Sequence, residues 1–90
     1  MYIRPDMFLT PDATVEVGRS DLEVTDVFVR LEDIKGAFGI VAYMTIEEAK
    51  TLAATLTELT HFESMSFGDV SVYAPKGGLL TELHDTLEAI

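Results

Sequence analysis

The chain of 90 residues contains no cysteine. This excludes a disulfide framework, a thiolate nucleophile and a zinc or iron–sulfur site with cysteine ligands, and a small uncross-linked domain fits a reducing compartment better than secretion. The first residues lack the basic end and apolar core of a signal peptide, and no apolar run approaches membrane-spanning length. We therefore expect a soluble, cytoplasmic protein.

Basic residues are also scarce. Six Lys and Arg stand against sixteen Asp and Glu, which gives a formal net charge of −10 at pH 7. A field of this sign repels phosphate backbones and anionic lipid surfaces. We therefore expect neither direct nucleic-acid binding nor membrane binding.

The length of the chain allows one domain only. An apolar content of 48% is sufficient for a core and excludes global disorder. The sequence contains no repeat, low-complexity tract or linker, so residues 1–90 are interpreted as a single acidic domain. Pro5 and Pro11 indicate that residues 1–12 form an extended N-terminal arm. Because so small a domain is marginally stable alone, a homo-oligomer is favoured.

Alternating apolar residues predict strands at 13–18, 22–31, 37–44 and 66–74. The apolar phase of the strand at 22–31 shifts along its length. We expect either a bulge near Thr25-Asp26 or partial burial of both faces.

Thr45 and Glu48 form the pattern of a capping box, and helical spacing of apolar residues continues from there to Leu59. A second amphipathic helix is predicted at 79–90, after a glycine turn. The expected fold class is α+β, with the order β-β-β-α-β-α: an antiparallel sheet of about four strands with two helices packed on one face.

The two histidines do not lie in the spacing of a metal site or of a nucleophile motif. His61 is interpreted as a cap at the end of the first helix, and His84 as partly buried beside the apolar stripe of the second. A metal site from His84 with Asp85 or Glu88 is a subordinate hypothesis. We assign no catalytic residue, no metal and no cofactor.

The glycine turn at residues 76–78 precedes the second helix, whose N-terminus could hold an anion. A flexible hinge explains the same residues more simply.

Apolar residues exceed what one buried face requires, and Met and aromatic types are common at interfaces. They either close the core or form a binding surface. The residues predicted for a protein interface are Leu80, Leu83, Leu87 and Ile90 on the second helix, with Phe62, Met65 and Phe67 as a second choice.

Acidic residues gather at the two ends of the strand at 22–31. A solvated face is the ordinary explanation, and a surface for a basic partner is the functional one. The residues in question are Asp21, Glu23, Asp26, Glu32 and Asp33.

The hairpin and helix from Val24 to Leu59, with the segment Met44-Thr45-Ile46-Glu47-Glu48-Ala49-Lys50-Thr51-Leu52-Ala53-Ala54-Thr55-Leu56, resemble short uncharacterised proteins of actinobacteria and their phages. In those proteins a strand is followed by a Thr-capped helix rich in Ala and Leu. The resemblance implies no activity and transfers no functional residue.

Three classes of function follow. The first is a non-enzymatic protein-binding module that self-associates as a homodimer and could be encoded by a phage. The alternative is an acidic inhibitor or nucleic-acid mimic, such as an anti-defence protein, that blocks a basic groove on a host protein. An enzyme is the third, and would need an active site across a subunit interface.

Overall fold

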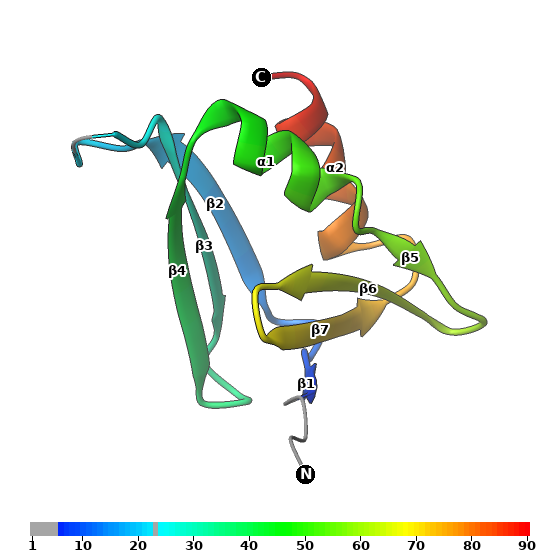
Figure 1. Ribbon diagram of the computed structural model, residues 1–90. Helices are drawn as coiled ribbons and strands as arrows, with labels where there is room; N and C mark the ends of the chain where they lie inside the picture. Colours follow the sequence, from blue (N-terminus) through cyan, green and yellow to red (C-terminus); the bar gives the residue numbers. More distant parts are fainter. Residues whose placement is uncertain (1–5, 23) are drawn as a thin grey trace, which may run out of the picture.

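The computed structural model describes residues 6–22 and 24–90 and confirms the α+β class. These residues form seven strands and two helices in the order β-β-β-β-α-β-β-β-α (Figure 1). The strands are β1 (Asp6–Phe8), β2 (Thr14–Arg19), β3 (Val27–Asp33), β4 (Phe38–Met44), β5 (Thr57–Glu58), β6 (Phe62–Phe67) and β7 (Val70–Pro75). The helices are α1 (Ile46–Ala53) and α2 (Leu79–Glu88).

The strands belong to two sheets, where the sequence suggested one. An antiparallel sheet has the order β2-β3-β4, and a second has the order β1-β7-β6-β5. The second sheet is antiparallel except for β1, which runs parallel to β7. In Figure 1 the two sheets stand side by side, and both helices lie across one end of them. Each helix contacts strands of both sheets.

The strand expected at 22–31 begins only at Val27, so it needs no bulge. The preceding residues form a loop in which the hydroxyl groups of Ser20 and Thr25 lie 2.6 Å apart. Val24 adopts a positive φ of 63° in this loop, a conformation that a β-branched residue rarely takes. The phase shift in the sequence therefore marks the end of a loop.

Helix α1 has the capping box expected of it. The amide of Glu48 donates to Oγ1 of Thr45, and the amide of Thr45 donates to Oε1 of Glu48. The helix is shorter than predicted, however, because it ends at Ala53 and not at Leu59. The hydroxyl of Thr55 donates to the carbonyl of Leu52 at 2.6 Å, and the chain then enters β5.

The strand expected at 66–74 is two strands. Gly68 adopts a φ of 60° and turns the chain between β6 and β7, so the apolar residues before and after it face each other across a hairpin. Residues 62–65, which precede the predicted strand, belong to β6.

Part of the predicted N-terminal arm is described, from residue 6 onward. Its strand β1 pairs with β7, Leu9 is buried, and the amide of Leu9 donates to the carbonyl of Tyr73 at 2.8 Å. Residues 1–5 of the predicted arm lie outside the described residues.

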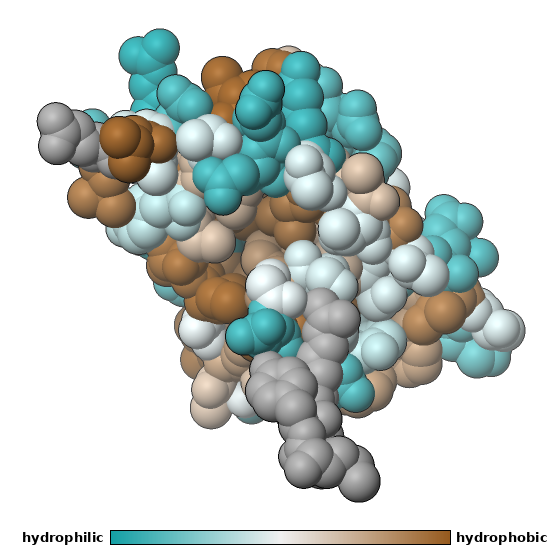
Figure 2. All heavy atoms as spheres, in the orientation of Figure 1, coloured by the Kyte–Doolittle hydropathy of each residue, from teal (hydrophilic) through white to brown (hydrophobic). Residues whose placement is uncertain are grey.

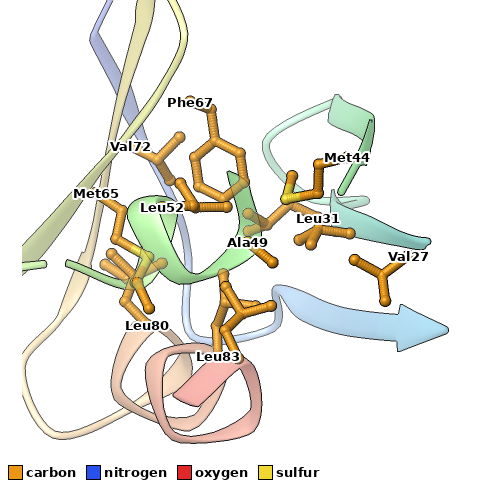
Figure 3. Close-up of a cluster of buried hydrophobic side chains, with 14 of the residues drawn as sticks. Val27, Leu31, Met44, Ala49, Leu52, Met65, Phe67, Val72, Leu80 and Leu83 are labelled. Carbon is orange, nitrogen blue, oxygen red and sulfur yellow. The ribbon is translucent and has the colours of Figure 1, made fainter. Parts of the chain in front are cut away.

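The core lies where the two sheets and the two helices meet (Figure 3). The inner faces of β3, β6 and β7 contribute to it together with the apolar stripes of both helices. Its buried apolar residues are Leu9, Val27, Val29, Leu31, Met44, Ala49, Leu52, Ala53, Met65, Phe67, Val72, Ala74, Leu80, Leu83 and Leu87.

Candidate functional site

Strand β4 is one of the two edge strands of the β2-β3-β4 sheet. Among residues 6–22 and 24–90, no strand pairs with its second edge. Residues 36–46, which include the whole of β4, contain no charged residue and no proline and are the longest uncharged stretch of the chain. The backbone groups along this edge are therefore open to another strand, without the charges or prolines that commonly block such an edge.

Both faces of β4 carry apolar side chains. Ile40 and Ala42 lie half-buried on the inner face, which is turned toward the helices, and Met44 is buried there. Val41 and Tyr43 lie on the outer face and are 41% and 51% exposed. An added strand would thus find apolar contacts above and below its backbone.

An open cleft of about 720 Å³ borders the inner face of β4. Its apolar wall is formed by β4, by Leu52 of α1 and by Phe67 at the end of β6. Glu47, Glu48 and Thr51 line it from α1. Figure 2 shows hydrophobic residues on the side of the molecule where Figure 1 places β4, and hydrophilic residues over α1.

The outer face of the same sheet is packed more firmly near its centre. The ring of Phe28 lies 6.4 Å from that of Tyr43, and the guanidinium carbon of Arg30 lies 5.5 Å from the Phe28 centroid. A Cβ atom at Gly18 would come within 2.6 Å of the Phe28 ring. Gly18 on β2 therefore makes room for Phe28, and the aromatic pair holds Tyr43 beside the open edge.

Most of the predicted interface residues lie in the core, so this prediction is corrected. Leu80, Leu83 and Leu87 are fully buried, because α2 turns its apolar stripe toward both sheets. Met65 and Phe67 are also buried, since they face inward on β6. The reading of these side chains as core closure is the one that the structure supports.

Two of the predicted interface residues are exposed. Ile90 is 36% exposed and follows the end of α2. Phe62 is 41% exposed and lies 6.0 Å from Phe8, whose ring stacks on Tyr73 at 4.8 Å. These three rings share the outer face of the β1-β7-β6-β5 sheet, whereas β4 belongs to the other sheet.

The predicted acidic surface is divided. Asp21 and Asp26 lie before β3, where Asp26 accepts a hydrogen bond from the amide of Ile46 at 3.0 Å. Glu32 lies near the opposite end of β3, 3.8 Å from Arg30. Glu23 is outside the described residues. Asp33 is fully buried and cannot contribute to a surface, which corrects that assignment.

Asp33 instead connects the N-terminal arm to β3. Its Oδ2 accepts from the amide of Thr10 at 2.7 Å, and its Oδ1 accepts from the Thr10 hydroxyl at 2.8 Å and from the amide of Gly36 at 3.2 Å. The Thr10 amide is the main cause that lowers the pKa of Asp33 below its usual range, and it outweighs burial, which acts in the opposite direction.

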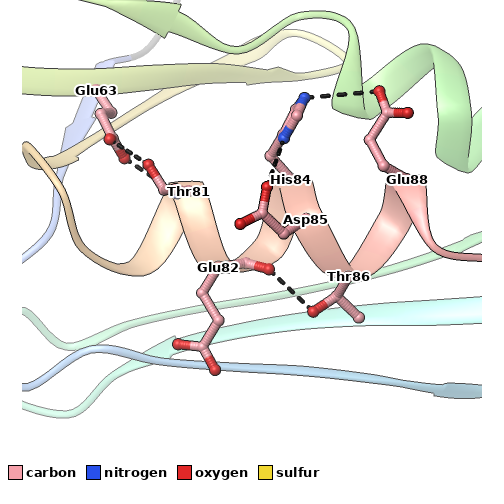
Figure 4. Close-up of polar contacts among 7 residues, drawn as sticks. All are labelled: Glu63, Thr81, Glu82, His84, Asp85, Thr86 and Glu88. Atoms are coloured by element: carbon pink, nitrogen blue, oxygen red, sulfur yellow. Dashed lines mark hydrogen bonds and ion pairs between the residues drawn. The ribbon is translucent and has the colours of Figure 1, made fainter.

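Glu63 is a second buried carboxylate that the sequence did not reveal. Its carboxylate accepts hydrogen bonds from the amides of Gly77 and Thr81, each at 3.0 Å, and from the Thr81 hydroxyl (Figure 4). Because the N-cap of α2 is Gly78, which has no side chain to offer, Glu63 caps the helix from β6. The anion site considered for this helix start is thus filled by the protein itself.

The histidines differ from their predicted roles in part. His61 lies before β6, well beyond the end of α1, so it does not cap that helix. The side chain of His84 is 30% exposed and lies 3.2 Å from Asp85 and 3.6 Å from Glu88 (Figure 4). In the described part of the chain, no three His, Asp or Glu side chains are placed to hold a metal ion together.

Comparison of the chain with protein-family models, with curated proteins and with solved structures found no match. Neither of the two helices that the structure describes is long and apolar enough to cross a membrane.

Proposed function

We propose that this protein is a non-enzymatic protein-binding module that takes up an extended strand of its partner at the edge of β4. The observation that carries this proposal is an uncharged strand of seven residues beside an open cleft with one apolar wall. In strand addition, main-chain hydrogen bonds supply affinity, and pockets for alternate side chains supply specificity. The β4 edge offers the first, and the cleft offers the second.

The arrangement of the acidic residues supports this proposal over an acidic inhibitor or nucleic-acid mimic. A mimic needs a continuous field of one sign to occupy a basic groove. Asp21 and Asp26 are separated from Glu32 by the length of β3, and Asp33 is buried. The net charge of −10 keeps the mimic as the alternative function, and its binding to a basic protein would weaken as salt is added.

A library of random twelve-residue peptides displayed on phage tests strand addition without a known partner. Peptides from this library are selected on wild-type protein immobilised at low surface density. The affinity of the enriched peptides is then measured by fluorescence anisotropy. We expect peptides with alternating apolar residues, and we expect Val41→Lys to weaken their binding at least about tenfold, because a charge on an edge strand opposes further pairing.

Ile34→Lys is the matched control. Ile34 is 90% exposed in the turn before β4, so this variant adds the same charge without altering the edge. Peptides that bind wild type, Val41→Lys and Ile34→Lys equally would contradict the proposal, as would a selection that yields no peptide dependent on Val41.

A further inference from the structure

We propose that the strand taken up at β4 is β4 of a second copy, in an antiparallel arrangement with its twofold axis at Val41. This inference rests on the proposed function, since it names the occupant of the same surface. It joins the two β2-β3-β4 sheets into one continuous sheet through a self-complementary edge.

The order of side chains along β4 suits such a pairing. With Val41 opposite Val41, Gly39 faces Tyr43 on the outer face, and Ile40 faces Ala42 on the inner face. In these two pairs a large side chain meets a small one, and an aromatic ring covers a glycine. A shift by one residue would exchange inner and outer faces and lose this match.

The cleft has an occupant in this register. Phe38 of the second copy lies opposite Met44, and Ile40 of the second copy lies opposite Ala42. Met44 and Ala42 both line the cleft, so these two apolar side chains extend over it. Because Phe38 and Ile40 are only half-buried in one copy, each copy gains cover for its own side chains while filling the cleft of the other.

The charges at the ends of β4 are also complementary. Lys35 precedes the strand, and Glu47 and Glu48 follow it. Antiparallel pairing brings the Lys35 end of one strand to the glutamate end of the other. Lys35 now pairs with Asp12 at 2.8 Å, but both side chains are well exposed, so this pair opposes the exchange only weakly.

Each copy carries a net charge of −10, so two copies repel each other at long range. Salt screens this repulsion but does not weaken the contacts between residues 36–46 of the two copies, because these residues are uncharged. The dimer should therefore become tighter as salt is added, which is the opposite of the salt dependence of an acidic mimic on a basic partner.

Cysteine cross-linking tests the register directly, because the chain contains no cysteine of its own. Residues directly opposite in an antiparallel pair have Cβ atoms about 4.5–5.5 Å apart, close enough for a disulfide after a small adjustment. We expect Val41→Cys to form a disulfide-linked dimer under mild oxidation. Gly39→Cys and Tyr43→Cys should each cross-link poorly alone and efficiently when mixed.

Ile34→Cys is the control for random collision, since Ile34 lies away from the strand and is more exposed than Val41, 90% against 41%. Cross-linking of Ile34→Cys as fast as that of Val41→Cys would overturn the proposed register. So would efficient cross-linking of Gly39→Cys with itself.

Sedimentation of charge variants gives an independent test. Val41→Lys and Val41→Glu should each be monomeric, because like charges would face each other at the twofold axis, and an equimolar mixture should form dimers. Wild-type protein that stays monomeric at high concentration, while Val41-dependent peptides still bind it, would overturn the second copy as occupant and leave strand addition standing. If neither a second copy nor a peptide uses the edge, both proposals are wrong.

Discussion

Among residues 6–22 and 24–90, the sheet β1-β7-β6-β5 ends in strands of three and two residues, whereas the sheet β2-β3-β4 ends in strands of six and seven residues. Very short edge strands leave few unpaired backbone groups and thereby prevent further pairing. The β5 edge of the β1-β7-β6-β5 sheet is thus closed by its brevity. Neither edge of the β2-β3-β4 sheet is closed in this way.

The two edges of the longer sheet also differ from each other. Strand β2 carries Glu16 and Arg19 and contacts α2. Strand β4 carries no charge and borders an open cleft. One of the four edges in the described part of the molecule therefore combines length, apolar side chains and free space, and for this reason we propose β4 as the binding surface.

The largest effect is expected in the short-edged sheet, at Glu63. Glu63→Ala should lower the free energy of unfolding by about 3 kcal/mol, because the amides of Gly77 and Thr81 lose the charged acceptor that the buried Glu63 supplies. Urea unfolding measures this. Glu58→Ala on β5, where the side chain is exposed, is the control, and equal stabilities of the two variants would refute the capping role of Glu63.

A smaller effect is expected in the sheet that ends at β4. Gly18→Ala should cost about 1 kcal/mol, since its Cβ would lie 2.6 Å from the Phe28 ring and displace it. Gly39→Ala is the matched control, because the nearest atom to its added Cβ is the Leu31 carbonyl oxygen at 4.0 Å. In the Phe28→Ala background, Gly18→Ala should cost little, because the ring that its Cβ would displace is gone. If the two substitutions instead lower stability additively, this explanation is wrong.

The smallest expected effect concerns the contact of Asp33 with Thr10, which connects β3 to the N-terminal arm. It appears in how steeply stability falls at acid pH. Because the pKa of Asp33 is lowered in the folded protein, its stabilisation is complete above the unfolded pKa of about 3.9. It is lost as the pH falls through the lower folded value. The melting temperature, measured from pH 2 to pH 7, should fall less steeply toward acid pH for Asp33→Asn than for wild type.

Asp12→Asn serves as the control for this measurement, because Asp12 is exposed and lies on the same arm. If the melting temperature falls equally steeply toward acid pH in wild type and in Asp33→Asn, the Thr10 contact does not contribute to the pH dependence.

Local patterns predicted much of the fold. The Thr45–Glu48 capping box, the apolar stripe of α2 and the alternation in β2 and β4 each depend on near neighbours, and the structure contains all of them. The misjudged ends have two causes. The start of β3 at Val27 and the end of α1 at Ala53 depend on pairing with segments further along the chain, whereas the turn at Gly68 joins Phe67 to Val70 locally and was a missed glycine signal.

The candidate site was harder to predict. Alternating apolar residues indicated a strand at 37–44, but such alternation does not show whether a strand lies at the centre or at the edge of a sheet. The uncharged stretch at residues 36–46 was a signal that could have indicated the edge position. Burial was misjudged for a related reason: an amphipathic helix shows which face is apolar, but not whether the domain itself covers that face.

By itself, the sequence determined the α+β class, the acidic charge and the positions of most strands and helices, because composition and periodicity act over a few residues. Only the tertiary structure decided that Leu80, Leu83 and Leu87 belong to the core, that Glu63 caps α2, and that β4 is left with an open edge beside a cleft. These features depend on which segments meet in space, and strand order is a property of the whole chain that no local pattern contains.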